Sequence, residues 1–213
     1  FWPANAPADG PNGPCGPCSE IYFDQNPSIQ GTPVDDSGKF AEIWNLVFTQ
    51  YDRQDGGKLV PLANKNIDTG MGLERLACVL QGKASNFEID IFQPIHAAIL
   101  KALKLDASKV PLKKIYPIAD HLRAAVFSIA DGVVPSNEGR GYVIRKLIRR
   151  AFWRAYEMLD TKGKQHLTAF LHEAAPAIIQ VMGAAYPELK EAEESIRSVL
   201  QQEEKRFSSN LKD

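Results

Sequence analysis

The chain has 213 residues, of which 44% are hydrophobic and 24% charged, and its formal net charge is −1. These proportions are typical of a globular protein with one large or two small domains. No apolar run is long enough for a membrane-spanning helix and no basic-then-apolar leader is visible, so we expect a cytoplasmic location. Because the chain begins with the apolar pair Phe1 and Trp2, we expect a piece of a longer protein.

Charge is distributed unevenly along the chain. Residues 1–100 contain 6 Lys and Arg against 12 Asp and Glu, whereas residues 111–160 contain 9 against 5. An acidic first half followed by a basic element predicts an anionic partner for the second half only.

Short β-type runs separated by loops rich in Gly, Pro and Asp occupy the first half. Strands are expected over 20–23, 41–51 and 58–61. Gly56 and Gly57 are expected to form a hairpin turn, and a helix is expected to begin near Gly70, where apolar residues recur at helical spacing. The chain divides near residue 110. Helices are expected beyond it over 119–130, 139–159, 166–182 and 187–211.

The chain has three cysteines, Cys15, Cys18 and Cys78. A structural zinc site would need two more thiolates or imidazoles at matching spacing, and the histidines form no such pair. The prolines around Cys15 and Cys18 favour a tight turn entering a strand, with metal or redox chemistry as the alternative. We expect no zinc site in this segment.

The segment 67–75, Ile-Asp-Thr-Gly-Met-Gly-Leu-Glu-Arg, leads into the first expected helix. Gly70 and Gly72 allow a ligand to approach the backbone closely, and Arg75 near a helix start suits a phosphate. Asp68 adds a carboxylate suited to an ammonium group. The segment predicts a site for a nucleotide and an amine; turn glycines followed by a solvated arginine are the alternative.

The helix expected over 139–159 has an unusual charge pattern. Its apolar residues cluster on one side, and the other side carries five cations with one acid, Glu157. The cations are Arg145, Lys146, Arg149, Arg150 and Arg154. Like charges four residues apart destabilise a helix with no local return in stability, so the pattern favours a phosphate-binding surface. A solvated face is the alternative.

Five segments, in order along the chain, closely resemble those of the alanyl-tRNA synthetase family of class II aminoacyl-tRNA synthetases. They are GPCGPCSEI (13–21), EIWNLVF (42–48), DTGMGLER (68–75), ADHLR (119–123) and PSNE with RGY (135–142). Any one could arise by chance, whereas five in order are specific. The resemblance covers nearly the whole chain.

The resemblance implies an α+β fold. Residues 1–110 would be the C-terminal part of a class II antiparallel-sheet catalytic domain, and residues 111–213 an all-helical domain that recognises the tRNA acceptor stem. Segment 68–75 is then the third class-defining motif. The first two motifs are missing and would precede Phe1, and any acidic partner for acceptor-stem reading would follow Asp213.

The resemblance also implies catalytic roles. Arg75 and Asp68 are the expected catalytic residues, with Arg75 on the ATP phosphates and Asp68 on the amino group of alanine. The expected alanine-binding residues are Trp2, Asn45, Val47, Asp68 and Gly70. The expected ATP-binding residues are Gly70, Gly72, Arg75 and Glu42. Glu42 opens a strand and alternates with Trp44, which makes it the candidate Mg²⁺ ligand; a surface glutamate is the alternative.

On the tRNA side, the resemblance sets Asn137 against the acceptor stem, where the family reads a G·U wobble pair. The expected tRNA-binding residues are Asn137, Arg140, Arg145, Arg149 and Arg150. A short amide suits the shallow minor groove of A-form RNA, and the arginines would position the stem more than specify it. A plain helix N-cap is the alternative role for Asn137.

The implied activity is that of an ATP-dependent alanine–tRNA ligase, which forms alanyl-adenylate and transfers alanine to tRNA(Ala). ATP and Mg²⁺ are the expected cofactors. L-alanine, tRNA(Ala) and the remainder of the synthetase chain are the expected partners. Without the first two motifs the chain alone is expected to be inactive. The alternative is a non-catalytic RNA-binding module derived from a synthetase; a generic nucleotide-binding enzyme would leave the basic helix unexplained.

Overall fold

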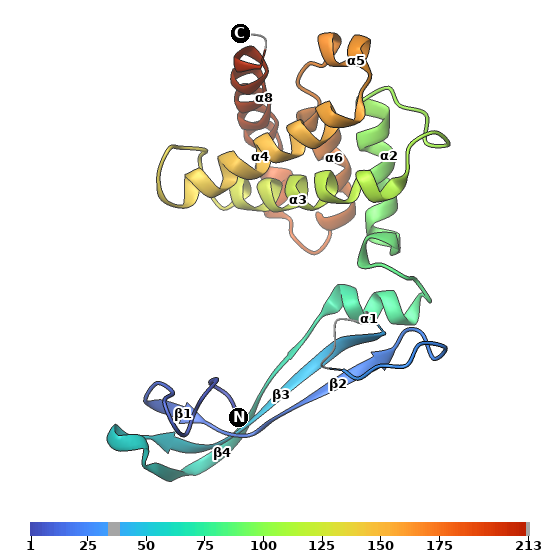
Figure 1. The fold of residues 1–213 in the computed structure, drawn as a ribbon. Helices are drawn as coiled ribbons and strands as arrows, with labels where there is room; N and C mark the ends of the chain where they lie inside the picture. The colour runs from blue at the N-terminus through green and yellow to red at the C-terminus, as the bar shows by residue number, and fades with distance from the viewer. Residues whose placement is uncertain (34–38, 212–213) are drawn as a thin grey trace. The chain divides into compact units, whose positions relative to one another are not determined.

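The computed structural model describes residues 1–33 and 39–211. The chain forms two compact units, Phe1–Ile89 and Asp90–Asp213, which are described separately (Figure 1). The division precedes the boundary expected near residue 110, because residues 93–102 form a helix that packs within the second unit. The roles assigned to the two parts remain predictions.

The first unit is an antiparallel sheet built around one long strand. Strand β3 (Phe40–Arg53) pairs along one edge with β1 (Gly13–Cys15) and β2 (Cys18–Asp24), and along the other with β4 (Leu59–Met71). The strands expected over 20–23 and 41–51 are confirmed. The β3–β4 connection is a 3₁₀ turn, η1 (Asp55–Gly57), which confirms the expected hairpin turn.

Strand β4 is much longer than the run expected over 58–61. Residues 63–66 lack the apolar alternation that would reveal a strand, but backbone pairing with β3 keeps them extended, with Asn66 opposite Thr49. Helix α1 (Leu73–Leu80) therefore begins after Gly72, and not near Gly70 as predicted. Asp68 and Gly70 consequently lie on a strand.

The second unit is helical over its described residues. Its helices are α2 (Gln93–Ala102), α3 (Tyr116–Ala130), α4 (Gly139–Met158), α5 (Thr161–His166), α6 (Leu171–Met182), α7 (Glu188–Glu191) and α8 (Glu193–Asn210). Short 3₁₀ turns are η2 (Asn86–Glu88) in the first unit, and η3 (Asp90–Phe92) and η4 (Leu112–Lys114) in the second. None of the described helices is both long and apolar enough to cross a membrane.

The helices expected over 119–130 and 139–159 are confirmed as α3 and α4. Of the two later ones, the first begins later than predicted and the second is divided. The helix expected over 166–182 is α6, which begins only at Leu171, because residues 167–170 form a non-helical link that buries Leu167, Ala169 and Phe170; the separate helix α5 ends at His166. The helix expected over 187–211 is α7 and α8, separated at Ala192. Buried apolar side chains in a link look like helix periodicity, which explains the first error.

The core of the second unit lies among α3, α4, α6 and α8. Its buried side chains include Ile118, Leu122, Val126, Ile144, Ile148, Phe152, Ile178, Ile196 and Leu200. Burying each large apolar side chain stabilises the fold by roughly 1.5–3 kcal/mol. This core holds one side of α4 against its neighbours and leaves the opposite side exposed.

Candidate functional site

Strand register gathers four expected alanine-binding residues on one face of the sheet. Asn45 on β3 lies opposite Gly70 on β4, and Val47 lies opposite Asp68. Paired residues in an antiparallel sheet share a face, and so do residues two apart along a strand. Asn45, Val47, Asp68 and Gly70 therefore form one group, which we call the strand-face patch.

The strand-face patch is open to solvent except at Val47, which is its buried apolar residue. Val47 is 7% exposed, and a Cβ built on Gly70 would meet no atom within 4 Å. The Asp68 side chain is exposed, and its carboxylate forms no hydrogen bond or ion pair within residues 1–33 and 39–211. The patch thus offers a carboxylate, an amide and bare backbone to a small polar molecule.

Glu20 and Tyr22 of β2 adjoin the patch, although sequence reasoning gave them no role. Glu20 lies opposite Asn45 and accepts hydrogen bonds from Asn45 Nδ2, at 2.9 Å, and from the Tyr22 hydroxyl. This hydrogen bond raises the pKa of Tyr22 to about 12, with desolvation and the charges of Glu20 and Glu42 contributing. Alternation along β2 was the signal that could have shown Glu20 and Tyr22 sharing a face.

A bulge in β3 brings Glu42 to the same face. Ile21 pairs with Trp44 and Tyr22 pairs with Glu42, which leaves Ile43 as an extra residue. Glu42 therefore joins the face of Tyr22, and the predicted alternation of Glu42 with Trp44 is wrong. In a regular strand without the bulge, Glu42 would lie on the face opposite to that of Asn45 and Val47.

Arg75, in the first turn of α1, reaches back to Glu42. Its Nη1 donates a hydrogen bond to the Glu42 carbonyl oxygen at 2.9 Å and lies 3.5 Å from the carboxylate Oε2. A Cβ on Gly72 would lie 3.1 Å from Arg75 Cδ, so the glycine leaves room for this side chain. The structure thus joins three of the expected ATP-binding residues, Glu42, Gly72 and Arg75.

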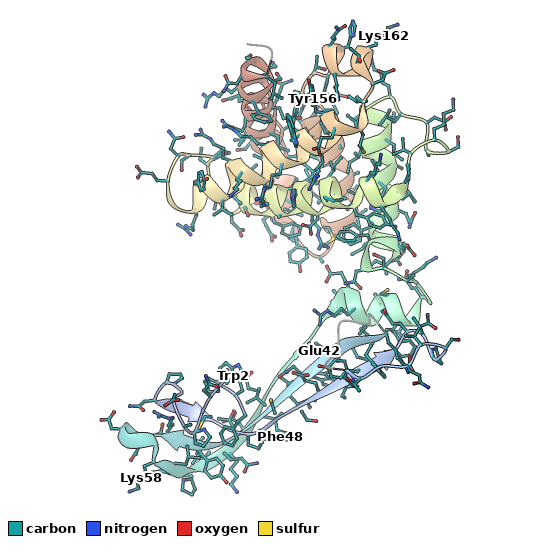
Figure 2. All side chains as sticks on the ribbon, in the orientation of Figure 1. Trp2, Glu42, Phe48, Lys58, Tyr156 and Lys162 are labelled. Atoms are coloured by element: carbon teal, nitrogen blue, oxygen red, sulfur yellow. The ribbon has the colours of Figure 1, made fainter. Side chains whose placement is uncertain are left out.

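Trp2 is attached to the sheet through Gly16. Two backbone hydrogen bonds, of 2.9 and 3.1 Å, join Trp2 and Gly16. A Cβ on Gly16 would lie 1.8 Å from the Phe48 carbonyl oxygen, so this segment lies directly against β3 beside Val47. Figure 2 shows Trp2 and Phe48 on this sheet, with Glu42 farther toward α1. The Trp2 side chain is 52% exposed.

The segment containing Cys15 and Cys18 connects β1 to β2, which follow one another along the same edge of β3 in the same direction. The tight turn predicted there is therefore wrong: the chain continues along β3 through Gly16 and Pro17, whose carbonyl oxygen accepts from Phe48 N–H. Cys15 ends β1 and is buried, Cys18 begins β2 and is exposed, and both thiols are free. In the part of the chain that the structure describes, no group of three or more His, Cys, Asp or Glu residues is arranged to hold a metal ion.

In the second unit, Asn137 lies in the loop before α4. Its Oδ1 accepts a hydrogen bond from Arg145 Nη1. The N-cap of α4 is Glu138, so the alternative role of Asn137 as the N-cap is wrong. A Cβ on Gly141 would lie 2.3 Å from the Val134 carbonyl oxygen, which means that the loop packs directly on the first turn of α4.

A buried acid from α8 compensates two of the cations on α4. Glu203 is 2% exposed, and its Oε1 lies 2.7 Å from Arg149 Nε and 3.3 Å from Arg145 Nε. Arg154 pairs with Glu157 at 3.0 Å. The expectation of uncompensated like charges is therefore wrong for Arg145 and Arg149, because Glu203 is too distant in sequence for a helix pattern to reveal. The partner of Arg154 is the one acid that the helix pattern already contained.

Other cations remain on the outer face of α4. Arg140, Lys146 and Arg150 are exposed, and Lys146 Nζ lies 5.9 Å from the centroid of the Tyr142 ring. Trp153, also exposed, stacks on Tyr156 with ring centroids 5.3 Å apart. Cations interleaved with exposed aromatic rings are typical of nucleic-acid-binding surfaces. The expected tRNA-binding arginines thus divide into an exposed pair and the pair held by Glu203.

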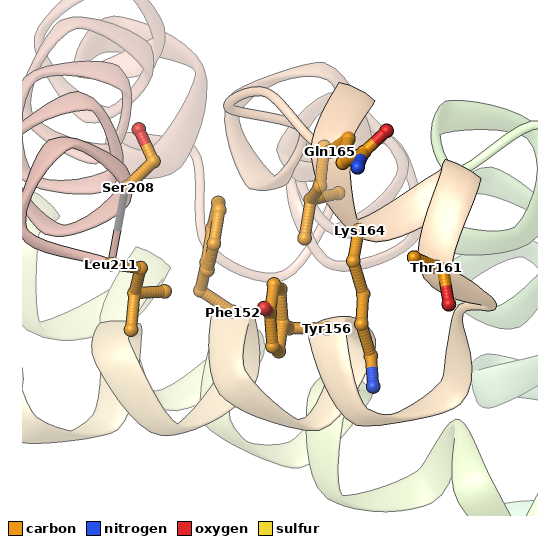
Figure 3. A pocket seen from close by; sticks show the side chains of 8 residues that line it. Phe152, Tyr156, Thr161, Lys164, Gln165, Ser208 and Leu211 are labelled. Carbon is orange, nitrogen blue, oxygen red and sulfur yellow. The ribbon is translucent and has the colours of Figure 1, made fainter. Parts of the chain in front are cut away.

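A cavity of about 500 Å³ lies elsewhere in the second unit, among α4, α5 and α8 (Figure 3). Its lining residues are Phe152, Tyr156, Thr161, Lys164, Gln165, Leu167, Ser208 and Leu211. None of the expected site residues lines this cavity, so it is separate from the candidate sites.

Comparison with known proteins agrees with the five-segment resemblance. The family model described as "tRNA synthetases class II (A)" matches residues 1–213. The chain is 47% identical over 208 residues to an alanine–tRNA ligase of Caulobacter vibrioides, covering 95% of this chain and 23% of that protein. It is 46% identical over 203 residues to the alanine–tRNA ligase of Bordetella petrii, covering 93% of this chain and 22% of that protein. It is 47% identical over 206 residues to the alanine–tRNA ligase of Nitrosospira multiformis, covering 95% of this chain and 23% of that protein.

The chain spans less than a quarter of the length of these relatives. The match to the family model nevertheless extends over every residue of the chain. The chain therefore belongs to the class II (A) family of tRNA synthetases.

Proposed function

We propose that this chain forms part of an alanine–tRNA ligase, which activates L-alanine with ATP and transfers it to tRNA(Ala). The observation that carries this proposal is the meeting of the strand-face patch with Glu42 and Arg75 on one face of one sheet. This arrangement offers an ammonium partner and a phosphate partner side by side. In this proposal residues 1–110 belong to the catalytic domain, and residues 111–213 recognise the tRNA.

The alanine site of the proposal is the strand-face patch. Asp68 receives the ammonium group, Asn45 the carboxylate or carbonyl oxygen, and Val47 and Trp2 wall the methyl side chain. Burying one methyl group contributes only about 0.8 kcal/mol, so recognition depends mainly on the charged groups. The open space at Gly70 lets the ligand backbone approach the strand.

The ATP site lies at the Arg75 end of the patch. Arg75 pairs with the phosphates, and Gly70 and Gly72 allow close approach to the backbone. Carboxylate oxygens are preferred ligands of Mg²⁺, and Glu42 fits this role because it is partly exposed beside a phosphate-binding arginine. Bound Mg²⁺ would neutralise phosphate charge. Positioning and charge neutralisation are the main requirements of such phosphate chemistry.

In the proposed reaction the alanine carboxylate attacks the α-phosphate of ATP. The bond between the α- and β-phosphates breaks, pyrophosphate leaves, and alanyl-adenylate remains. A terminal ribose hydroxyl of the tRNA then attacks the alanyl carbonyl and releases AMP. Asp68 holds the amine during both steps, while Arg75 offsets charge during the first.

The tRNA side of the proposal uses the outer face of α4 and the loop before it. Arg140 and Arg150 contact phosphates, and Asn137 reads the G·U wobble pair of the acceptor stem from the minor groove. Arg145 and Arg149 contribute less phosphate attraction, because Glu203 offsets their charge. A cytoplasmic location suits this role, and the three free thiols are consistent with it.

The proposal is tested on the full-length protein. We expect ATP–pyrophosphate exchange that depends on alanine, and charging of tRNA(Ala) that falls when the G·U pair becomes G·C. Tight tRNA binding with no exchange would identify a non-catalytic RNA-binding module instead. Exchange that depends on another amino acid would contradict the alanine assignment.

A further inference from the structure

The loop residue Asn137 is connected to the interior of the helical unit by a chain of charged contacts. Arg145 Nη1 donates a hydrogen bond to Asn137 Oδ1, and Arg145 Nε lies 3.3 Å from Glu203 Oε1. Glu203 belongs to α8, and Arg149 Nε also donates to its Oε1, at 2.7 Å. Three elements, the loop, α4 and α8, are therefore joined at one guanidinium.

The end of this chain of contacts that lies inside the unit is Glu203, a buried residue with two arginine partners. Glu203 is 2% exposed, and the side chains of Arg145 and Arg149 are 16% and 33% exposed. A buried carboxylate keeps its charge at low cost only while cationic partners remain, so both arginines are held in place. The guanidinium is planar and rigid, and Arg145 can therefore form an ion pair with Glu203 through its Nε side while Nη1 donates a hydrogen bond to Asn137.

The contact also fixes which way the Asn137 amide faces. Its oxygen accepts from a cation, whereas a flipped amide would set its NH₂ group against the guanidinium N–H groups. Charge-assisted hydrogen bonds are about twice as strong as neutral ones, so the flipped state is disfavoured. The two Nδ2 protons of Asn137 are left facing away from Arg145.

We propose that Arg145 is a positioning residue which, held by Glu203, orients the Asn137 amide so that its N–H groups face acceptors in the RNA minor groove. Pyrimidine O2 and the ribose 2′-hydroxyl are acceptors of this kind. The inference rests on the proposed role of Asn137 in reading the G·U pair. It assigns Arg145 to specificity instead of phosphate binding.

The test uses the full-length protein and two synthetic acceptor-stem hairpins that differ only in a G·U or G·C pair. The readout is the discrimination ratio, kcat/KM for charging the G·U hairpin over that for the G·C hairpin. Asn137→Ala should lower this ratio by about 5- to 150-fold, which corresponds to one base contact of about 1–3 kcal/mol. Arg145→Met should lower it to a similar extent, and the double variant no further, because both changes remove one contact.

Arg149→Met is the matched control, since it removes the other partner of Glu203 without touching Asn137. It should keep the discrimination ratio within about twofold of the parent, even where kcat/KM falls for both hairpins. Arg145→Lys keeps the charge beside Glu203 but lacks the planar fork. It should also lower the ratio, and it replaces Arg145→Met in the test if that variant does not fold.

The outcomes separate the inference from the function on which it rests. A parent-like ratio in both Arg145 variants, with a lowered ratio in Asn137→Ala, would overturn the positioning role and leave the reading role of Asn137 intact. An unchanged ratio in Asn137→Ala would overturn both. Equal losses in the Arg145 and Arg149 variants would assign the effect to the burial of Glu203, against the proposal.

Discussion

Gly16 and Gly70 belong to the same sheet region but differ in what a methyl group would meet. A Cβ at Gly16 would lie 1.8 Å from the Phe48 carbonyl oxygen, whereas a Cβ at Gly70 would meet nothing within 4 Å. We expect Gly16→Ala to destabilise the sheet by about 1–3 kcal/mol through overpacking. Gly70→Ala should leave the melting temperature nearly unchanged but raise the KM for alanine.

Thermal melting and alanine-dependent exchange are both measured on the two full-length variants, so that each variant serves as the control for the other. A parent-like melting temperature for Gly16→Ala would refute the close approach to β3. A parent-like KM for Gly70→Ala would show that the open space above Asn45 is not used by substrate.

The buried side chain of His96 makes the stability of the fold depend on pH. It is 2% exposed, and its two ring nitrogens lack hydrogen-bond partners among the described residues; its ring stacks 5.9 Å from Phe92 and 5.3 Å from Tyr116. Burial lowers the pKa of His96 from 6.5. The unfolded chain therefore binds a proton near pH 6.5 that the folded chain does not, and stability falls as the pH drops below that value.

The loss due to His96 should reach at most about 1.4 kcal/mol per pH unit. Urea unfolding followed by helical circular dichroism at about pH 7.5 and about pH 5.5 measures it. His96→Phe removes the titrating group and should reduce the difference between the two conditions. The same difference in parent and variant would contradict this account.

Among the elements, α8 holds α6 through a buried carboxylate. Glu204 is fully buried, and it accepts hydrogen bonds from the backbone N–H groups of Phe170 and Leu171 at 2.8 and 2.9 Å. These donors lie at the start of α6, where the helix dipole also favours a negative charge. Glu204→Gln should therefore lower the free energy of unfolding by about 1–3 kcal/mol, measured by urea titration.

Glu194→Gln is the control for this change, because Glu194 is an exposed acid on the same helix. It should cost no more than about 0.3–1 kcal/mol, the usual contribution of an acid in a first helical turn. Equal effects of the two changes would exclude a special role for the buried contact.

The proposed contact between the outer face of α4 and RNA phosphates can be tested through the salt dependence of tRNA binding. If Arg150 contacts a phosphate, Arg150→Gln should reduce the slope of log Kd against log salt for tRNA binding by about 0.7–0.9. Arg197→Gln, an exposed change on α8, should leave the slope unchanged. Fluorescence anisotropy over a salt series measures both slopes, and a parent-like slope for Arg150→Gln would remove α4 from the RNA contact.

At the scale of the whole molecule, sequence pattern and resemblance predicted the family, the hairpin, and helices α3 and α4. They also singled out Asn45, Val47, Asp68 and Gly70, which strand register then brought onto one face. Short motifs carry this information because each consists of residues that are close together in the sequence.

What the sequence did not predict depends on contacts between elements. The bulge at Ile43 is invisible to strand alternation, and only pairing with β2 reveals it. Glu203 compensates Arg145 and Arg149 from a separate helix, and the long polar β4 is held by its ladder with β3. Tertiary context overrides local pattern in each case.

The central claim is that Asp68 receives the amino group of alanine. In the full-length protein, Asp68→Asn should lower kcat/KM for alanine in ATP–pyrophosphate exchange by about 10- to 150-fold, since a hydrogen bond to a charged group contributes about 1.5–3 kcal/mol. Asp52→Asn, a change elsewhere on β3, should leave exchange at the parent level. Unchanged exchange in a folded Asp68→Asn protein would contradict the claim.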